Sequence, residues 1–160
     1  MNSTIAIDVA APPDLVFRLA RDVERWEHLL PHYVRSRAID PVGEQARVVE
    51  FIARRAVVPA LGLGVPVVWR ARCWAEADLR RLRFVHVAGA TKGMHVTWRI
   101  EPADAGTRVL IEHDFSPPIP GLARFVDRVF TRPIAARTLA TFKTLAEALW
   151  ESPEADKPRV

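Results

Sequence analysis

Apolar and polar residues alternate along most of the chain between residues 33 and 115, which is the pattern of half-buried strands. Turn signals rich in Gly, Pro and Asp separate the alternating runs. Because the connections are short, we expect an antiparallel meander. A further short strand is predicted at Thr4–Val9. The six runs predicted as strands are Tyr33–Ile39, Ala46–Val57, Val65–Ala77, Arg81–Ala88, Met94–Glu101 and Arg108–Phe115.

Two regions have helical spacing instead. The first begins at Pro12-Pro13-Asp14, where proline is tolerated in a first helical turn, and stops at Leu30-Pro31, which predicts two short helices. The second begins near Leu122, and we expect a kink or a break at Pro133. Beyond this proline one apolar helix face is predicted, formed by Ala135, Leu139, Phe142, Ala146 and Leu149.

This order of elements predicts a single α+β domain over residues 1–150, followed by a flexible polar tail at 151–160. A curved antiparallel sheet of about seven strands has one face that must be covered. The long C-terminal helix can cover it, so we expect a helix-grip arrangement in which the sheet wraps around this helix. The gap between the two would form a cavity.

Composition narrows the class of protein. With 160 residues, 49% of them hydrophobic, the chain is neither disordered nor too short for a core. The single Cys73 excludes a disulfide scaffold or a Cys-rich zinc module. No apolar run is long enough to span a membrane and no signal peptide is recognised, so we expect a cytoplasmic protein without stable membrane insertion.

Charge and motifs argue against several functions. The net charge is +4, but the basic residues are mostly scattered arginines, which favours a solvated surface and no nucleic-acid partner. His28 and His32 lie on either side of Pro31, which breaks the helix that a zinc pair would need. Phosphate-loop and dinucleotide motifs are missing from the sequence. We therefore expect no metal and no cofactor.

Four phrases of the sequence resemble one known superfamily. They are Asp22-Val23-Glu24-Arg25-Trp26 followed by Tyr33, then Trp69, then Gly93-Met94-His95-Val96-Thr97-Trp98, and finally Gly106-Thr107-Arg108-Val109 leading to Asp114-Phe115. Together they are similar to the START-like helix-grip superfamily, and most similar to its bacterial polyketide cyclase/dehydrase subgroup. The resemblance implies a hydrophobic or aromatic small molecule in an internal cavity.

The aromatase/cyclases of this superfamily direct an aldol ring closure and a dehydration, and the resemblance extends that expectation to this chain. By position, Trp26, Leu30 and Tyr33 would lie at the cavity mouth. The place of the proposed catalytic arginine of those enzymes falls on Cys73. Arg70 and Arg72 are close in sequence but have the opposite strand parity, so they should point to solvent.

Strand parity and helical spacing select the residues that should face the cavity, because side chains two apart in a strand share a face. An alternative is that the same aromatic residues form a packed core without a cavity. The expected ligand-binding residues are Trp26, Leu30, Tyr33, Phe51, Trp69, Cys73, Phe84, Met94, Trp98, Ile111, His113, Phe115, Phe125, Val129 and Phe130.

Two histidines, His86 and His113, lie on strand faces that are otherwise apolar. Desolvation there would keep them neutral and able to accept a proton near pH 7. For an aldol closure, either histidine is a candidate base, and Tyr33 or Arg137 a candidate donor to the enolate oxygen. The structural alternative is a core histidine bonded to a backbone carbonyl or to water.

The segment 56–66 carries no charge, which is unusual for a surface loop. It could be a lid over the cavity, a dimer contact, a loop that touches membranes transiently, or part of the core. Three functions follow from the sequence: a polyketide cyclase/aromatase-like enzyme, a carrier or sensor of a lipid, quinone or polyketide, and a structural subunit without a ligand. The chain could be a monomer or a homodimer.

Overall fold

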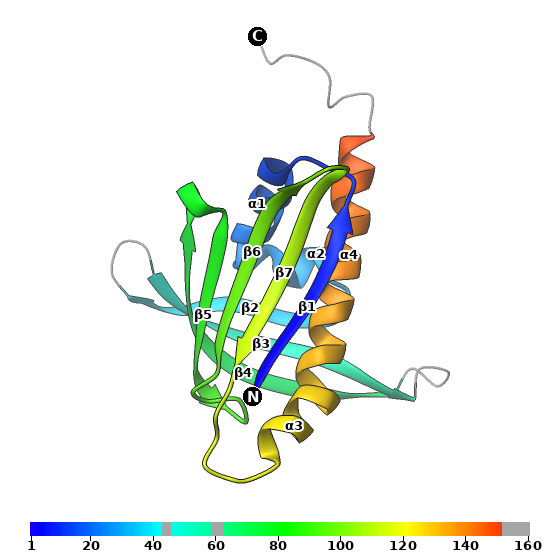
Figure 1. Ribbon diagram of the computed structural model, residues 1–160. Coiled ribbons are helices and arrows are strands. Elements are labelled where there is room, and N and C mark those ends of the chain that lie inside the picture. Colours follow the sequence, from blue (N-terminus) through cyan, green and yellow to red (C-terminus); the bar gives the residue numbers. More distant parts are fainter. Residues whose placement is uncertain (43–45, 59–62, 152–160) are drawn as a thin grey trace.

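The computed structural model describes residues 1–42, 46–58 and 63–151. Its main element is a curved sheet of seven antiparallel strands in the order β1-β7-β6-β5-β4-β3-β2, so that the meander predicted from the alternation is confirmed and β1 is added beside β7 (Figure 1). The strands are β1 (Asn2–Val9), β2 (Tyr33–Val42), β3 (Ala46–Val58), β4 (Leu63–Glu76), β5 (Arg81–Gly89), β6 (His95–Ala103) and β7 (Gly106–Asp114).

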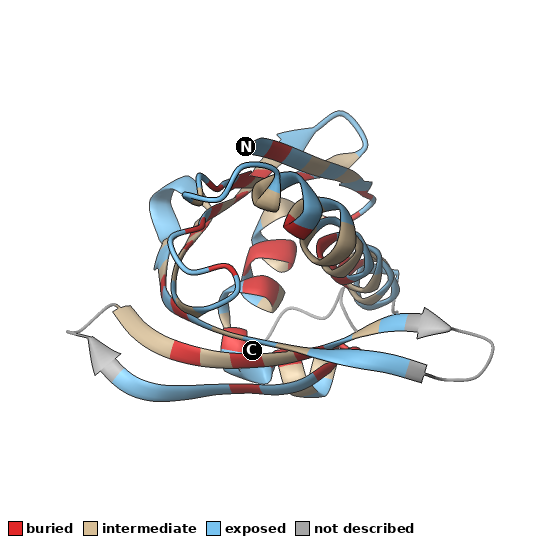
Figure 2. Cartoon of the chain, turned by 90° about the horizontal axis from the view of Figure 1, so that it is seen from below, coloured by how far each residue is buried: buried red, intermediate tan, exposed pale blue. Residues whose placement is uncertain are grey.

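Short helices join β1 to β2, and a longer helical region ends the described chain. The first group is α1 (Pro13–Arg21), η1 (Val23–Arg25) and α2 (Trp26–Leu29), and η3 (Ala77–Leu79) lies between β4 and β5. The C-terminal region comprises α3 (Leu122–Val126), the π-helical turn η4 (Asp127–Thr131) and α4 (Arg132–Trp150). The sheet curves around these helices, with the buried positions on its inner side (Figure 2).

The discontinuity expected at Pro133 lies one turn earlier. Pro133 is in the first turn of α4, where its missing N–H leaves no hydrogen bond unmade. The irregularity is instead the π turn η4, which inserts extra residues into the helix. The side chains before and after this turn therefore face different directions.

One face of α4 packs into the concave side of the sheet. Ala135, Leu139, Phe142 and Ala146 are buried as predicted, whereas Leu149 is 48% exposed because the last turn extends past the sheet. Burial of a side chain such as Phe142 contributes about 2–3 kcal/mol. No helix in the described ranges is both long and apolar enough to cross a membrane.

Four shifts interrupt the regular register of the sheet over the described residues, one of them in the β3–β4 ladder between Ala56 and Val58. The β4–β5 ladder shifts between Arg70 and Ala71, which leaves Val87 as an extra residue. Gly89 then adopts a positive φ of 94°, and a Cβ there would lie 2.6 Å from the Val68 carbonyl oxygen, so only glycine fits. Two further shifts occur in β2, at Val34 and Ile39, on the free edge of the sheet.

Two predicted segments fall partly outside the described residues. Residues 152–160, most of the predicted tail, lie outside the described residues, as do 59–62 of the uncharged segment. The described residues Ala56, Gly64, Val65 and Pro66 beside that gap are exposed at the end of the β3–β4 hairpin. Their exposure does not support a fold-back of these flanks into the core.

Candidate functional site

A cavity of about 90 Å³ lies between α4 and the concave side of the sheet. Its wall is largely aromatic and aliphatic, with a few polar side chains. The sheet supplies most of the wall, α2 supplies Trp26, and η4 and α4 close it from the other side. The lining residues are Trp26, Tyr33, Phe51, Val67, Trp69, Phe84, His86, Thr91, Met94, Val96, Trp98, Ile111, His113, Phe130, Thr131, Ile134, Ala135 and Thr138.

Trp26 is the centre of the aromatic part of the wall. Its ring lies 5.2–5.9 Å from five other aromatic rings, those of Tyr33, Phe51, Phe84, Trp98 and Phe142. Its indole Nε1 donates to the Ala20 carbonyl at 3.0 Å, so the one polar atom of the side chain is satisfied within the core. Trp26 is therefore a packed wall residue whose donor is already used.

A stack of three rings leads from this cluster to the first histidine. Trp69 stacks on Phe51 at 5.2 Å on one side and on His86 at 6.1 Å on the other. His86 Nδ1 lies 2.6 Å from the Thr91 hydroxyl oxygen, and the backbone of His86 pairs with Gly93 and Met94. The turn after β5 thus folds Thr91 over the ring and holds its orientation.

Both predicted histidines belong to the cavity wall and are neutral at pH 7. Burial, together with smaller electrostatic effects of His113 and His95, lowers the pKa of His86 to about 3. Burial also lowers the pKa of His113 to about 4, whereas the Asp127 carboxylate and the Ser3 backbone raise it. Both rings line the same cavity.

Tyr33 lies on the cavity wall beside a third histidine, His32, which the sequence brought into consideration only as a metal ligand. Burial raises the pKa of the Tyr33 phenol, so it keeps its proton. His32 Nε2 lies 2.9 Å from the Thr138 hydroxyl, which itself donates to the Ile134 carbonyl at 2.8 Å. Because a hydroxyl has one proton, Thr138 must accept from His32, which places that histidine's proton on Nε2. Burial, with the charge of Arg137, lowers the pKa of His32 to about 4.

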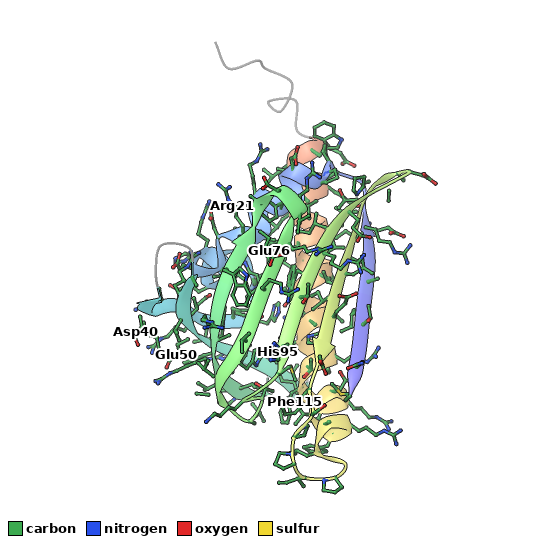
Figure 3. The ribbon with its side chains drawn as sticks, turned by 60° about the vertical axis from the view of Figure 1, so that its left-hand side comes forward. Arg21, Asp40, Glu50, Glu76, His95 and Phe115 are labelled. Carbon is green, nitrogen blue, oxygen red and sulfur yellow. The ribbon has the colours of Figure 1, made fainter. Side chains whose placement is uncertain are left out.

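Several predicted site residues lie elsewhere. Leu30 and Phe115 are buried outside the cavity wall, and Figure 3 labels Phe115 at the end of the sheet where the chain leaves for α3. Phe125 is 56% exposed, and the π turn leaves Val129 outside the lining while Phe130 is inside. Arg137, proposed as a donor, is exposed on α4 and is not brought to the cavity.

The strand carrying Cys73 has the predicted parity. Cys73 is buried, but it faces a second cavity of about 210 Å³ near Arg21 and Arg47 instead of the aromatic one. Burial raises the pKa of its thiol to about 12, so it stays protonated. Arg70 and Arg72 point outward as expected: Arg70 pairs with Glu50 at 2.9 Å, and Arg72 lies over the Trp74 ring. In the described part of the chain, no arginine belongs to the wall of the aromatic cavity.

Sequence reasoning missed the hydroxyl groups of the wall. Thr138 could have been found, because it is a polar residue at helical spacing from Ala135 and Phe142 on an apolar face. Thr91 had no such signal, since only the folded turn brings it to His86. Thr131 faces the cavity because of the π turn.

Comparison with known proteins gives one family and a set of similar folds. The family model described as polyketide cyclase / dehydrase and lipid transport matches residues 2–147. A search of the curated proteins finds no match. The solved structures include the Zhui aromatase/cyclase from Streptomyces sp. R1128, which is 19% identical with a TM-score of 0.76, covering 93% of this chain and 94% of that one.

Two further structures show how widely this fold is shared. The di-domain ARO/CYC BexL from the BE-7585A biosynthetic pathway is 23% identical with a TM-score of 0.72; the match covers 95% of this chain and 48% of that one. A START superfamily protein from Mycobacterium smegmatis is 12% identical with a TM-score of 0.67, over 92% of this chain and 98% of that one. At these identities the similarity establishes the helix-grip fold and not the chemistry.

Proposed function

Since the chain belongs to the polyketide cyclase/dehydrase and lipid transport family, we propose that its aromatic cavity binds a poly-β-keto or related aromatic molecule and promotes an aldol cyclisation followed by dehydration. The observation that carries this proposal is the pair of neutral histidines, His86 and His113, in a wall that is otherwise mostly apolar. A neutral imidazole accepts a proton, and an apolar surrounding strengthens its electrostatic interaction with a charged intermediate.

His113 is the proposed base. Its imidazole takes a proton from a methylene between two carbonyl groups, and the C–H electron pair becomes an enolate. The enolate carbon bonds to a second carbonyl carbon of the same chain, and the resulting alkoxide takes a proton. Loss of a second α-proton and departure of the hydroxyl as water then complete the dehydration. The growing negative charge favours protonated His113, which offsets the lowering of its pKa by burial.

Tyr33 is the proposed donor to the enolate oxygen. Its phenol is protonated and its side chain lines the same cavity as both histidines. Arg137, the other donor considered from the sequence, is exposed and is therefore not proposed as the donor. His86, held by Thr91, orients the bound molecule or takes the second proton.

A synthetic linear tetraketide thioester tests this function. Cyclised and dehydrated products are measured by liquid chromatography and mass spectrometry against the rate in buffer. We expect His113→Ala to lower the acceleration about 100-fold or more while changing binding of the thioester little. His95→Ala is the matched control, because His95 is exposed on the neighbouring strand with the opposite parity (Figure 3). Full acceleration in His113→Ala would exclude His113 as the base.

A carrier without chemistry is the second candidate, and the outward direction of Arg70 and Arg72 favours it. In that case the protein would deliver a lipid, quinone or polyketide, with the hairpin around residues 56–66 touching a membrane. Val65 at the end of this hairpin and Val68 further along β4 are both 48% exposed. Val65→Asp should slow transfer of ubiquinone between phosphatidylcholine vesicles, whereas Val68→Asp should not. Equal rates in both variants would argue against contact through this hairpin.

Native mass spectrometry of the purified protein, followed by denaturing extraction, separates the two candidates further. A co-purifying lipid or quinone supports the carrier, and an aromatic polyketide supports the cyclase. Binding of the tetraketide without any acceleration by the wild-type protein would also favour the carrier.

A further inference from the structure

A polar cluster that includes His113 lies where β1 and β7 meet the start of α4. Ser3 on β1 is paired in register with His113 on β7. Arg132, at the start of α4, donates to the Ser3 hydroxyl at 3.2 Å and lies 3.5 Å from Oδ2 of Asp127. Ser3 and Arg132 thus link His113 to Asp127 across elements far apart in sequence, and the Asp127 carboxylate raises the pKa of the histidine.

Two atoms of this cluster are buried without a partner. They are Nδ1 of His113 and Oδ1 of Asp127, and neither has a hydrogen bond to any described residue. An unmade hydrogen bond in the interior is costly, and more so for a charged group. The two atoms are complementary if His113 carries its proton on Nδ1, because an ionised carboxylate can only accept.

Asp127 belongs to the same π turn as two residues of the cavity wall, Phe130 and Thr131. This turn therefore carries both wall residues and the carboxylate that acts on the pKa of His113. π turns within helices are frequent at functional sites. The side chain of Asp127 is only 15% exposed, and Arg132 holds its other oxygen from the outer side.

We propose that Asp127 is a positioning residue that accepts the Nδ1 proton of His113, directly or through one water molecule, and so leaves Nε2 as the free base of the cavity. The catalytic meaning of this arrangement rests on the proposed cyclase function, but the position of the proton does not. The charged or titratable groups that act on His113 are Asp127 from η4, Arg132 from α4 and His86 from β5.

The position of the proton is measured directly by NMR. Protein labelled with ¹⁵N and ¹³C in histidine is examined at pH 7 by long-range ¹H–¹⁵N correlation, which distinguishes the two tautomers of each neutral ring. His113→Gln assigns the resonances of that residue. In the wild-type protein we expect His113 to be the Nδ1–H tautomer, while His32 is the Nε2–H tautomer that its contact with Thr138 requires.

Substitution of Asp127 then tests the cause. The amide of Asp127→Asn can donate to Nδ1, so the Nε2–H tautomer of His113 should rise to at least half of the population. Asp127→Ala removes the acceptor without adding a donor and should also give a mixture, whereas Asp127→Glu should keep the wild-type tautomer. Asp114→Asn is the matched control, because Asp114 adjoins His113 but is exposed on the other face of β7.

Four results would overturn the proposal. The first is an Nε2–H tautomer of His113 in the wild-type protein, which decides the question without any variant. The second is an Nδ1–H tautomer unchanged in both Asp127→Asn and Asp127→Ala, which would assign the acceptor to the Ser3 backbone instead. The third is an equal change in Asp114→Asn. A loss of tetraketide cyclisation in Asp127→Asn with the tautomer unchanged would likewise refute the positioning role, whatever becomes of the cyclase function.

Discussion

Two parts of the interior differ in how completely their buried polar atoms are hydrogen-bonded. Around Trp26, five aromatic rings pack against one indole, and its N–H is bonded to the Ala20 carbonyl. Around His113, a cavity remains open, and two buried polar atoms lack partners within the described chain. The first part also lines the cavity, but it is packed like the core of any small domain. The second retains unused hydrogen-bonding capacity next to empty space, which indicates a binding or catalytic role.

The largest effect is expected from a substitution in the packed part of the interior, around Trp26. Trp26→Ala deletes the ring that contacts five others and should lower the free energy of unfolding by about 3–5 kcal/mol. Chemical denaturation followed by circular dichroism measures this loss. His113→Gln in the other part should cost far less, so similar losses in the two variants would contradict the division.

Acid should weaken the fold through its histidines before its carboxylates. The pKa values of His32, His86 and His113 are all lowered by burial, so the unfolded chain binds protons first as the pH falls. The stabilisation is complete above pH 6.5, the ordinary histidine value, and is lost as the pH falls to about 4 for His32 and His113 and to about 3 for His86. Each histidine should remove about 2 kcal/mol between pH 6.5 and 4.5.

The free energy of unfolding measured across this pH window tests the prediction. Glu27 and Glu50, whose pKa values are lowered by hydrogen bonds, titrate below the window. His113→Gln should therefore reduce the loss of unfolding free energy across this window by the contribution of one histidine. An unchanged slope would mean that His113 is already protonated or solvated in the folded protein.

A smaller effect should follow from the hydrogen bond between His32 and Thr138. Thr138→Val keeps the shape of the side chain but removes the hydroxyl, which leaves His32 Nε2 without its acceptor. We expect a loss of about 1–3 kcal/mol in unfolding free energy. Thr144→Val, at an exposed position of the same helix, is the control and should change little. Equal effects of the two substitutions would refute a specific role of the buried bond.

The smallest effect is expected where a predicted cavity residue proved to be exposed. Phe125 is 56% exposed, so Phe125→Ala should change the unfolding free energy by less than about 1 kcal/mol. Phe130, five residues later, lines the cavity, and Phe130→Ala should alter tetraketide binding as well. Thermal unfolding and tetraketide titration of the two variants compare these positions directly. A tetraketide affinity lowered equally by both substitutions would indicate that α3 also reaches the ligand.

Some predictions from the sequence succeeded and others failed because the spacing of apolar residues carries only part of the structural information. Alternation tells which side of a strand a residue faces, so Phe51, Trp69, Trp98 and Ile111 were correctly predicted to face inward. It does not tell how far along the groove a residue lies. Phe115 therefore faces inward yet lies beyond the cavity.

Helical spacing failed for a different reason. It assumes a regular turn, and the π turn η4 shifts the sequence register before α4 begins. Phe125 and Val129 were expected to share the ligand face, but that face is occupied by Phe130, Thr131 and Ile134. Asp127 was overlooked because its partners come from β1, β7 and α4, and no local pattern in the chain connects them.

The two register shifts in β2 have a consequence for how copies of the protein meet. The opposite border of the sheet, β1, is covered by α4, where Lys143 donates to the Asp8 carbonyl and Glu147 accepts from the Ala10 amide. The border at β2 is covered in part by α2 and η1, where the Ser36 amide donates to Glu27 and the Ser36 hydroxyl to the Val23 carbonyl, but it still exposes Val34 and Ile39. The bulges at these two positions bend the strand, and Arg35, Arg37 and Asp40 add charge, all of which disfavours pairing with the strand of a second molecule. The fold thereby guards against strand-mediated aggregation at this border.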